Sequence, residues 1–190
     1  YGFAGFNMIW LEWNAHSLAA AWIPLIFLLT KKFLETSRTV WGVAFSVSLA
    51  LMILSGYPQI ILYTLGAIAL FLLFRKEKTS VLSLLKLGLF ILLGMALSSL
   101  QLIPAMELFA NSQRTRELID PAIRYLPWQN LINFFAPDFF GNPATGNYWG
   151  VGNYTLNTGY SGMVAIFLAI VGGVKYLKDR NIRFFIVLFF

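Results

Sequence analysis

Short basic segments recur in this chain at every second boundary between its apolar runs. Eleven of the 14 Lys and Arg residues lie in these segments. They are Lys31, Lys32, Arg38, Arg75, Lys76, Lys78, Lys86, Lys175, Lys178, Arg180 and Arg183. Helices that cross a membrane back and forth produce such an alternation, because basic loops are retained on the cytoplasmic side. The pattern therefore predicts an all-α, polytopic bundle of transmembrane helices with its basic loops in the cytoplasm.

The boundaries between these basic segments carry acids, aromatic residues and amides instead. Five of the eight acidic residues lie there, namely Glu12, Glu107, Glu117, Asp120 and Asp138. If the basic loops are cytoplasmic, this second polar face lies outside the cytoplasm. We therefore expect substrate binding and chemistry at the extracytoplasmic face.

The composition supports a membrane protein independently of the charge pattern. Hydrophobic residues make up 58% of the chain and charged residues only 12%, which leaves more apolar surface than a soluble domain could bury. The net charge is +6, but its basic residues lie in short loops, where they serve topology and attraction to anionic headgroups. We therefore expect the lipid bilayer, and no nucleic acid, as a partner.

The residue types present also limit the chemistry. The chain has no cysteine, which excludes disulfides, thiolate catalysis and Cys-ligated metals within these residues. Its single histidine cannot be grouped with a second His or a Cys into a metal site. No metal site or cofactor is therefore evident from the sequence, and a divalent cation is left open.

The apolar runs predict about five spans and part of a sixth within one transmembrane domain that covers residues 1–190. The expected spans are 17–30, 40–55, 58–74, 81–103 and 162–177, followed by a partial span at 184–190. Gly56 and Pro58 are expected to break the chain at the outer turn between the second and third spans, and Pro104 to end the fourth. Because the sequence starts at Tyr1 and stops inside an apolar run, we expect it to be a piece of a longer protein.

The extracytoplasmic segment 104–160 is too long for a simple connection and is the expected functional region. Residues 106–117 have helical spacing. Residues 125–135 are expected to form an amphipathic helix that lies on the membrane surface, with its Trp and Phe side chains toward the acyl chains. Residues 136–162 are rich in Gly, Asn, Tyr and Pro and are expected to form a loop.

Several tracts on the outer face together resemble bacterial YfhO-type membrane proteins. They are 55–59 (Ser-Gly-Tyr-Pro-Gln), 101–104 (Gln-Leu-Ile-Pro) with Glu107 and Arg114 following, 136–141 (Ala-Pro-Asp-Phe-Phe-Gly), and 157–162 (Asn-Thr-Gly-Tyr-Ser-Gly). The opening stretch 1–34, with His16 before Pro24, is also similar to this family.

The resemblance implies a GT-C-like glycosyltransferase of the bacterial plasma membrane. Such an enzyme takes a sugar from a polyprenyl-phosphate carrier and passes it to a cell-envelope glycopolymer or lipid acceptor at the extracytoplasmic face. Enzymes of this class place a catalytic acid in their first extracytoplasmic loop. We expect that principal acid to lie upstream of Tyr1.

The chemistry of such a transfer points to particular outer residues. A carboxylate must deprotonate the acceptor hydroxyl, and cationic groups must stabilise the leaving phosphate. Glu12 and Glu107 are the candidate acids. Arg114 and Arg116 are the candidates for the carrier phosphate, because a guanidinium offers paired donors to phosphate oxygens. The remaining substrate-binding candidates are His16, Gln59, Gln101 and Tyr160.

Each candidate also has a structural interpretation. Glu107 could simply pair with Arg114, His16 could bond to backbone at a helix start, and the two glutamines could cap helices or join them. For the whole protein, a lipid or polymer transporter and a non-catalytic membrane scaffold are the alternatives. Apart from Lys86, the spans carry almost no ionisable residue, so no ion relay for a transporter is visible.

Overall fold

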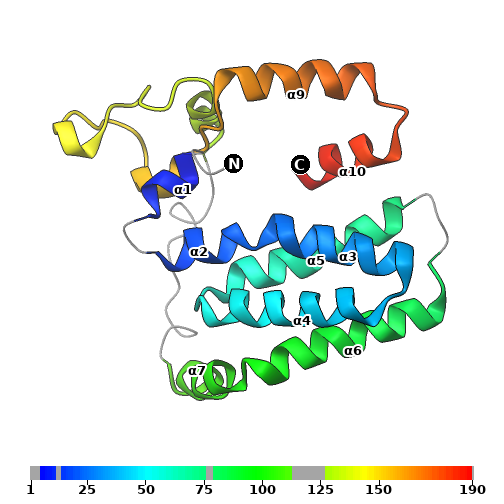
Figure 1. The fold of residues 1–190 in the computed structure, drawn as a ribbon. Helices are drawn as coiled ribbons and strands as arrows, with labels where there is room; N and C mark the ends of the chain where they lie inside the picture. The colour runs from blue at the N-terminus through cyan, green and yellow to red at the C-terminus, as the bar shows by residue number, and fades with distance from the viewer. Residues whose placement is uncertain (1–4, 12–13, 76–78, 113–126, 190) are drawn as a thin grey trace. The chain divides into compact units, whose positions relative to one another are not determined.

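The computed structural model describes residues 5–11, 14–75, 79–112 and 127–189, and within these ranges the chain forms helices and loops without a strand (Figure 1). The predicted all-α class is therefore confirmed for the described part. The α-helices are α1 (Gly5–Ile9), α2 (Ala15–Ala21), α3 (Ile23–Thr36), α4 (Thr39–Leu54), α5 (Pro58–Phe74), α6 (Val81–Leu97), α7 (Ser99–Asn111), α9 (Met163–Lys175) and α10 (Arg180–Phe189). Three short 3₁₀ helices are η2 (Trp128–Phe134), η3 (Pro143–Thr145) and η4 (Tyr154–Asn157).

The chain divides into two compact units, which are described separately. The helical unit comprises residues 18–110 and 172–190, and it contains α3 to α7 together with α10. The loop unit comprises residues 1–17 and 111–171, and it contains α1 and the three 3₁₀ helices. The division separates most of the apolar helices from the polar segment that the sequence marks as functional.

The core of the helical unit lies where α4 packs against α3 on one side and α6 on the other. Its fully buried apolar side chains include Ile26, Phe33, Phe45, Leu49 and Met52. The Phe33 ring meets the Phe90 ring edge to face at 5.3 Å between centroids, a geometry that aromatic pairs prefer.

Small residues line the face of α4 that meets α6. Gly42, Ser46 and Ala50 are buried and lie four residues apart, so they form one stripe along the helix. A Cβ atom at position 42 would collide with the Phe90 ring, and one at position 94 would press on the Ser46 carbonyl at 3.0 Å. This close approach between small residues is typical of helix pairs in membranes.

Four buried hydroxyl groups of the helical unit donate to a carbonyl of their own helix. Each bonds four residues back: Thr30 to Ile26 at 2.8 Å, Ser46 to Gly42 at 3.1 Å, Thr64 to Ile60 at 2.8 Å and Ser98 to Gly94 at 3.0 Å. A hydroxyl group bonded in this way needs no water. These four side chains are therefore buried with a hydrogen-bond partner.

The contacts between α4 and α6 show that the two helices run in the same direction. Phe90 lies against Gly42, and Gly94 lies farther along, against Ser46 and Leu49. Lys86 precedes Phe90 by four residues, as Arg38 precedes Gly42. The starts of both helices therefore lie at the same end of the unit.

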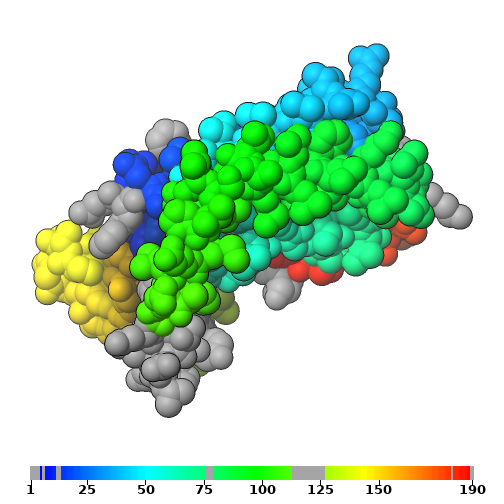
Figure 2. All heavy atoms as spheres, turned by 90° about the horizontal axis from the view of Figure 1, so that it is seen from below, coloured from blue at the N-terminus to red at the C-terminus, as the bar shows by residue number. Residues whose placement is uncertain are grey.

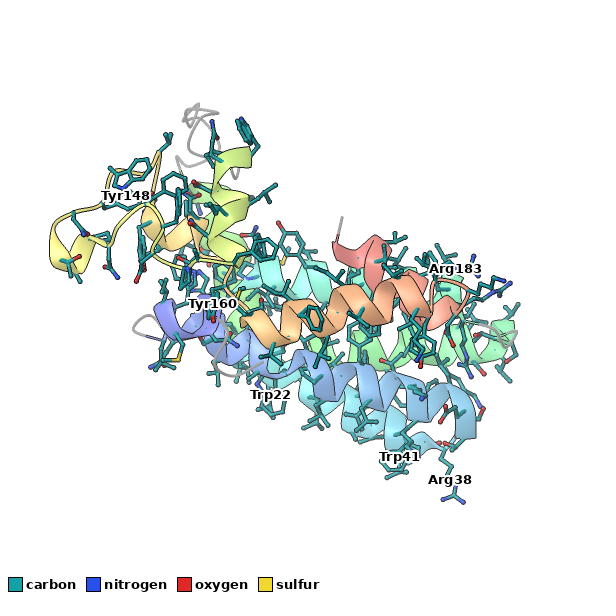
Figure 3. All side chains as sticks on the ribbon, turned by 90° about the horizontal axis from the view of Figure 1, so that it is seen from above. Trp22, Arg38, Trp41, Tyr148, Tyr160 and Arg183 are labelled. Atoms are coloured by element: carbon teal, nitrogen blue, oxygen red, sulfur yellow. The ribbon has the colours of Figure 1, made fainter. Side chains whose placement is uncertain are left out.

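The basic residues of the helical unit gather at that end. The Arg180 Nη1 atom donates to the Arg75 carbonyl at 3.5 Å, which joins the start of α10 to the end of α5. Figure 3 shows Arg38 and Arg183 toward one end of the helices and Trp22 toward the other. The helical unit thus has a basic end, as the alternation of charges predicted, and an opposite end that carries Gln59, Gln101 and Glu107.

In length and apolar character, one described helix could cross a membrane. It is the continuous stretch Ala15–Thr36, formed by α2 and α3, and it extends beyond the predicted span 17–30. The helices α4, α5 and α9 are apolar but shorter, with 16, 17 and 13 residues. Taken as one broken span, α6 and α7 would count as a second such stretch.

The helix α6, which corresponds to the fourth predicted span, ends before Pro104. The chain bends by 78° between α6 and α7, and Pro104 lies inside α7. At the bend, the Ser98 hydroxyl donates to the carbonyls of Gly94 at 3.0 Å and Met95 at 3.1 Å. A serine that bonds back to the helix in this way favours a kink. The predicted break at Gly56 and Pro58 is confirmed, with Gly56 at φ +81 and Pro58 opening α5.

Candidate functional site

Two buried asparagines fix the backbone of the loop unit. Asn133 in η2 donates through Nδ2 to the Asn157 carbonyl at 3.1 Å, and Asn157 donates to the Val151 carbonyl at 2.8 Å. Both side chains are buried. The segment predicted at 125–135 as an amphipathic helix is thus a 3₁₀ helix over Trp128–Phe134, and its amide side chains hold the following loop.

The loop between Asp138 and Gly150 closes on itself. The Trp149 N–H donates to the Phe140 carbonyl at 2.9 Å, and the Asn142 N–H donates to Asn147 Oδ1 at 2.9 Å. Gly141 between them has φ +80, and a Cβ atom there would collide with the Asn147 carbonyl. Glycine is therefore required at this position, and the closed loop holds its side chains in fixed places.

Asp138 is the carboxylate at the start of this loop. The Tyr154 hydroxyl donates to Asp138 Oδ1 at 2.7 Å. The Asn142 amide donates to the Tyr154 hydroxyl oxygen at 3.3 Å and to the same carboxylate oxygen at 3.5 Å. Asp138 is exposed, and the hydrogen bonds from Tyr154 and Asn142 both go to its Oδ1 atom. An exposed carboxylate held in this way can accept hydrogen bonds from the hydroxyl groups of a ligand.

The Tyr154 hydroxyl remains a donor at neutral pH. Its pKa is raised from 10.0 to about 12, mainly by burial, and also by the hydrogen bond to Asp138, the negative charge of Asp138 and the neighbouring Tyr148. A protonated Tyr154 keeps one oxygen of the Asp138 carboxylate occupied. The tyrosine thus positions the carboxylate and is not itself a base under ordinary conditions.

Aromatic residues pack together in the same loop. Trp149 is 66% exposed and packs edge to face on Phe140 at 4.8 Å between centroids. Tyr148, labelled in Figure 3, packs edge to face on Tyr154 at 5.6 Å, and Tyr154 is the residue that donates to Asp138. The exposed indole of Trp149 offers an apolar surface to a ligand. We call Asp138, Asn142, Tyr148, Trp149 and Tyr154 the loop cluster.

A second polar cluster lies in the helical unit, at the end opposite the basic residues. The Tyr57 hydroxyl donates to Gln59 Oε1 at 3.0 Å, and Gln59 Nε2 donates to the Tyr63 hydroxyl at 2.6 Å. Gln101 Nε2 lies beside Gly56, 3.8 Å from where a Cβ atom would be. The structure thus brings the predicted residues Gln59 and Gln101 to the same end of the helical unit.

The other predicted site residues are distributed over both units. His16 lies in α2 with its ring stacked on Trp10 at 4.0 Å between centroids. The Tyr160 carbonyl accepts a hydrogen bond from the Gly5 N–H at 2.6 Å, and Glu107 is an exposed residue of α7. Glu12, Arg114 and Arg116 lie outside the described residues.

The sequence analysis named Asp138 among the outer acids without selecting it, and it did not choose Tyr148, Trp149 or Tyr154 as site residues. Tyr154 follows Asp138 by 16 residues, and no periodicity predicts that pairing. The usable signal was the glycine and asparagine content between them, because those residues permit a closed loop.

The described residues contain no group of three or more His, Asp and Glu side chains that could hold a metal ion. The arrangement that they do form suits hydrogen bonding and aromatic packing to a polar organic ligand. Comparisons of the chain with protein-family models, with curated proteins and with solved structures found no match.

Proposed function

We propose that this chain belongs to a multi-pass bacterial plasma-membrane protein of the GT-C-like, YfhO-type class. In this proposal it transfers a sugar from a polyprenyl-phosphate carrier to a cell-envelope glycopolymer or lipid acceptor at the extracytoplasmic face. The proposal infers sugar transfer from the resemblance of the sequence tracts to this class. The loop cluster is the structural observation that supports it most directly.

The surface of the helical unit supports a place in the membrane. Along α6, large apolar side chains face outward, including Val81, Leu82, Leu85, Leu89 and Leu92 (Figure 2). Exposed apolar surface of this extent is costly in water and favourable in a bilayer. The basic end of the unit is consistent with a bilayer environment, and so are the buried hydroxyl groups that donate to carbonyls of their own helices.

The loop cluster supports a sugar as the ligand. A sugar offers hydroxyl groups at its rim and apolar C–H groups on its faces. Asp138 and Asn142 provide an acceptor and donors for the hydroxyl groups, and the Trp149 indole provides a surface for an apolar face. In this role Asp138 orients the sugar, Glu12 and Glu107 remain the candidate acids, and the carrier phosphate is assigned to Arg114 and Arg116.

The two alternative functions, a transporter and a non-catalytic scaffold, would require different properties of the same residues. A transporter coupled to ions would need ionisable groups within its spans, and Lys86 is the one such residue within α4, α5 and α6. A non-catalytic scaffold would tolerate loss of the Asp138 carboxylate. Neither interpretation uses the Asp138 carboxylate that Tyr154 and Asn142 hold in place, so glycosyl transfer is preferred.

The test is sugar transfer by membranes that contain the complete protein, with Asp138→Asn compared with Glu35→Gln. Glu35 is a carboxylate of α3 whose contact with Lys31 is an exposed pair at 3.8 Å. We expect Asp138→Asn to lower kcat/KM by about tenfold or more, because a charged hydrogen bond contributes roughly 1.5–3 kcal/mol. Glu35→Gln should leave transfer unchanged. Equal activity of the two variants would contradict the role of Asp138, and absence of transfer by the wild type would contradict the proposed function.

A further inference from the structure

The end of α5 and the start of α10 bring several cationic side chains together in the helical unit. Arg180 opens α10 and donates to the Arg75 carbonyl at the end of α5. Arg183 follows one helical turn later, so it lies on the same face as Arg180. Both arginine side chains are exposed, and Figure 3 shows Arg183 at the end of the helices.

A phenylalanine cluster fixes α10 against its neighbours. Phe184 is 2% exposed, and its ring lies 5.5 Å from that of Phe71 and 6.1 Å from that of Phe27. The ring of Phe74 lies at 6.3 Å. Arg183 directly precedes Phe184 in the chain. The buried ring therefore holds the two arginines in place.

The charge around this junction is strongly positive. The described cations there are Arg75, Lys175, Lys178, Arg180 and Arg183, and the one described carboxylate among them is Asp179. Within the described ranges, neither Arg180 nor Arg183 forms an ion pair with a carboxylate, and the one pair found joins Lys31 to Glu35 on α3. Neighbouring like charges repel, and an anion bound between them removes that cost.

Apolar side chains are exposed next to these cations. Leu73 on α5 is 79% exposed, and it precedes Arg75, whose carbonyl Arg180 contacts, by two residues. Val187 on α10 is 49% exposed, and it follows Arg183 by four residues and Arg180 by seven, so it lies on the same face of the helix. A small inorganic anion would leave this surface uncovered. A phosphate attached to acyl chains would neutralise the arginines and cover the apolar side chains together.

We propose that Arg180 and Arg183 bind the phosphate of an anionic phospholipid whose acyl chains lie against Leu73 and Val187. Paired guanidinium donors match phosphate oxygens in geometry as well as charge. This inference relies on the membrane placement in the proposed function, but not on sugar transfer. It adds a specific lipid site at the cytoplasmic end of the helical unit.

The test uses the complete protein in an uncharged detergent, with short-chain phosphatidylglycerol as the probe. Binding is followed by the lipid-dependent rise in unfolding temperature, since a ligand of the native state stabilises it. The double variant Arg180→Gln/Arg183→Gln is compared with Lys32→Gln/Arg38→Gln, which removes the same charge from α3 and the residue before α4. We expect roughly fivefold weaker binding for each arginine removed from the site and less than about a twofold change in the control.

Four outcomes of the binding comparisons would overturn the lipid site, and a fifth comes from a single variant. They are an equal loss in both double variants, no stabilisation of the wild type by phosphatidylglycerol, equal stabilisation by phosphatidylcholine, and equal binding of inorganic phosphate. The single variant Arg183→Gln guards against a folding defect, because Arg183 forms no side-chain hydrogen bond with other described residues. If Arg183→Gln keeps the wild-type unfolding temperature without lipid and also keeps full lipid binding, the proposal is wrong. Failure of sugar transfer leaves this measurement unaffected.

Discussion

The Ser46 hydroxyl donates to the Phe90 carbonyl at 2.7 Å and to the Gly42 carbonyl of its own helix at 3.1 Å. This serine therefore joins α4 to α6 at the point where Gly42 admits the Phe90 ring. The hydrogen bond and the close approach depend on each other, because both need small side chains on this face of α4. Together they set the register that brings the basic starts of the two helices to one end.

Replacing Gly42 with leucine should separate α4 from α6. A side chain at this position would overlap the Phe90 ring, and overpacking of a close interface costs about 1–3 kcal/mol. The matched control is Gly88→Leu in α6, where a Cβ atom would meet nothing within 4 Å. We expect that control to change stability by no more than about 1 kcal/mol, in the favourable direction, because leucine is the better helix former. Thermal unfolding in detergent measures the stability of both variants. Equal unfolding temperatures would show that α4 and α6 are not close-packed at Gly42.

Tyr154 should ionise at a higher pH than an ordinary tyrosine. Its pKa is about 12 in the folded protein against an ordinary value of 10.0. The folded state therefore holds the Tyr154 proton more tightly, and the resulting stability is fully present below pH 10 and is lost as the pH rises toward 12. Phenolate absorbance measures the titration, and Tyr154→Phe identifies the signal. The Asp138→Asn variant should lower the pKa of Tyr154; an unchanged pKa would mean that the carboxylate does not act on it.

Gln59→Leu should reduce sugar transfer without reducing stability. Gln59 is exposed and links the Tyr57 and Tyr63 hydroxyl groups. Loss of exposed hydrogen bonds of this kind changes the free energy of unfolding by less than about 0.5 kcal/mol. A steady-state assay and a thermal melt on the same preparation separate the two effects. Full activity in Gln59→Leu would assign these three residues to helix capping alone.

The charge pattern and the turn at Gly56 and Pro58 could be predicted because each depends on local sequence. The bend at Ser98 could not, since Pro104 is the stronger helix breaker and only the packing of α6 against α4 shows where the helix ends. Ser46 and its small neighbours were predictable in principle from their spacing of four residues. The pairing of Asp138 with Tyr154 was not, because it depends on how the loop between them closes.

The measurement that tests the account most directly is the sidedness of two engineered cysteines in intact bacterial cells. The 190 residues contain no natural cysteine, so Ala144→Cys in η3 and Lys178→Cys beside α10 each add one thiol at an exposed position. A membrane-impermeant maleimide should label Ala144→Cys on intact cells and Lys178→Cys only after permeabilisation. Labelling of Lys178→Cys from outside, or of both positions under the same condition, would contradict a membrane protein with a cytoplasmic basic end and an extracytoplasmic loop cluster.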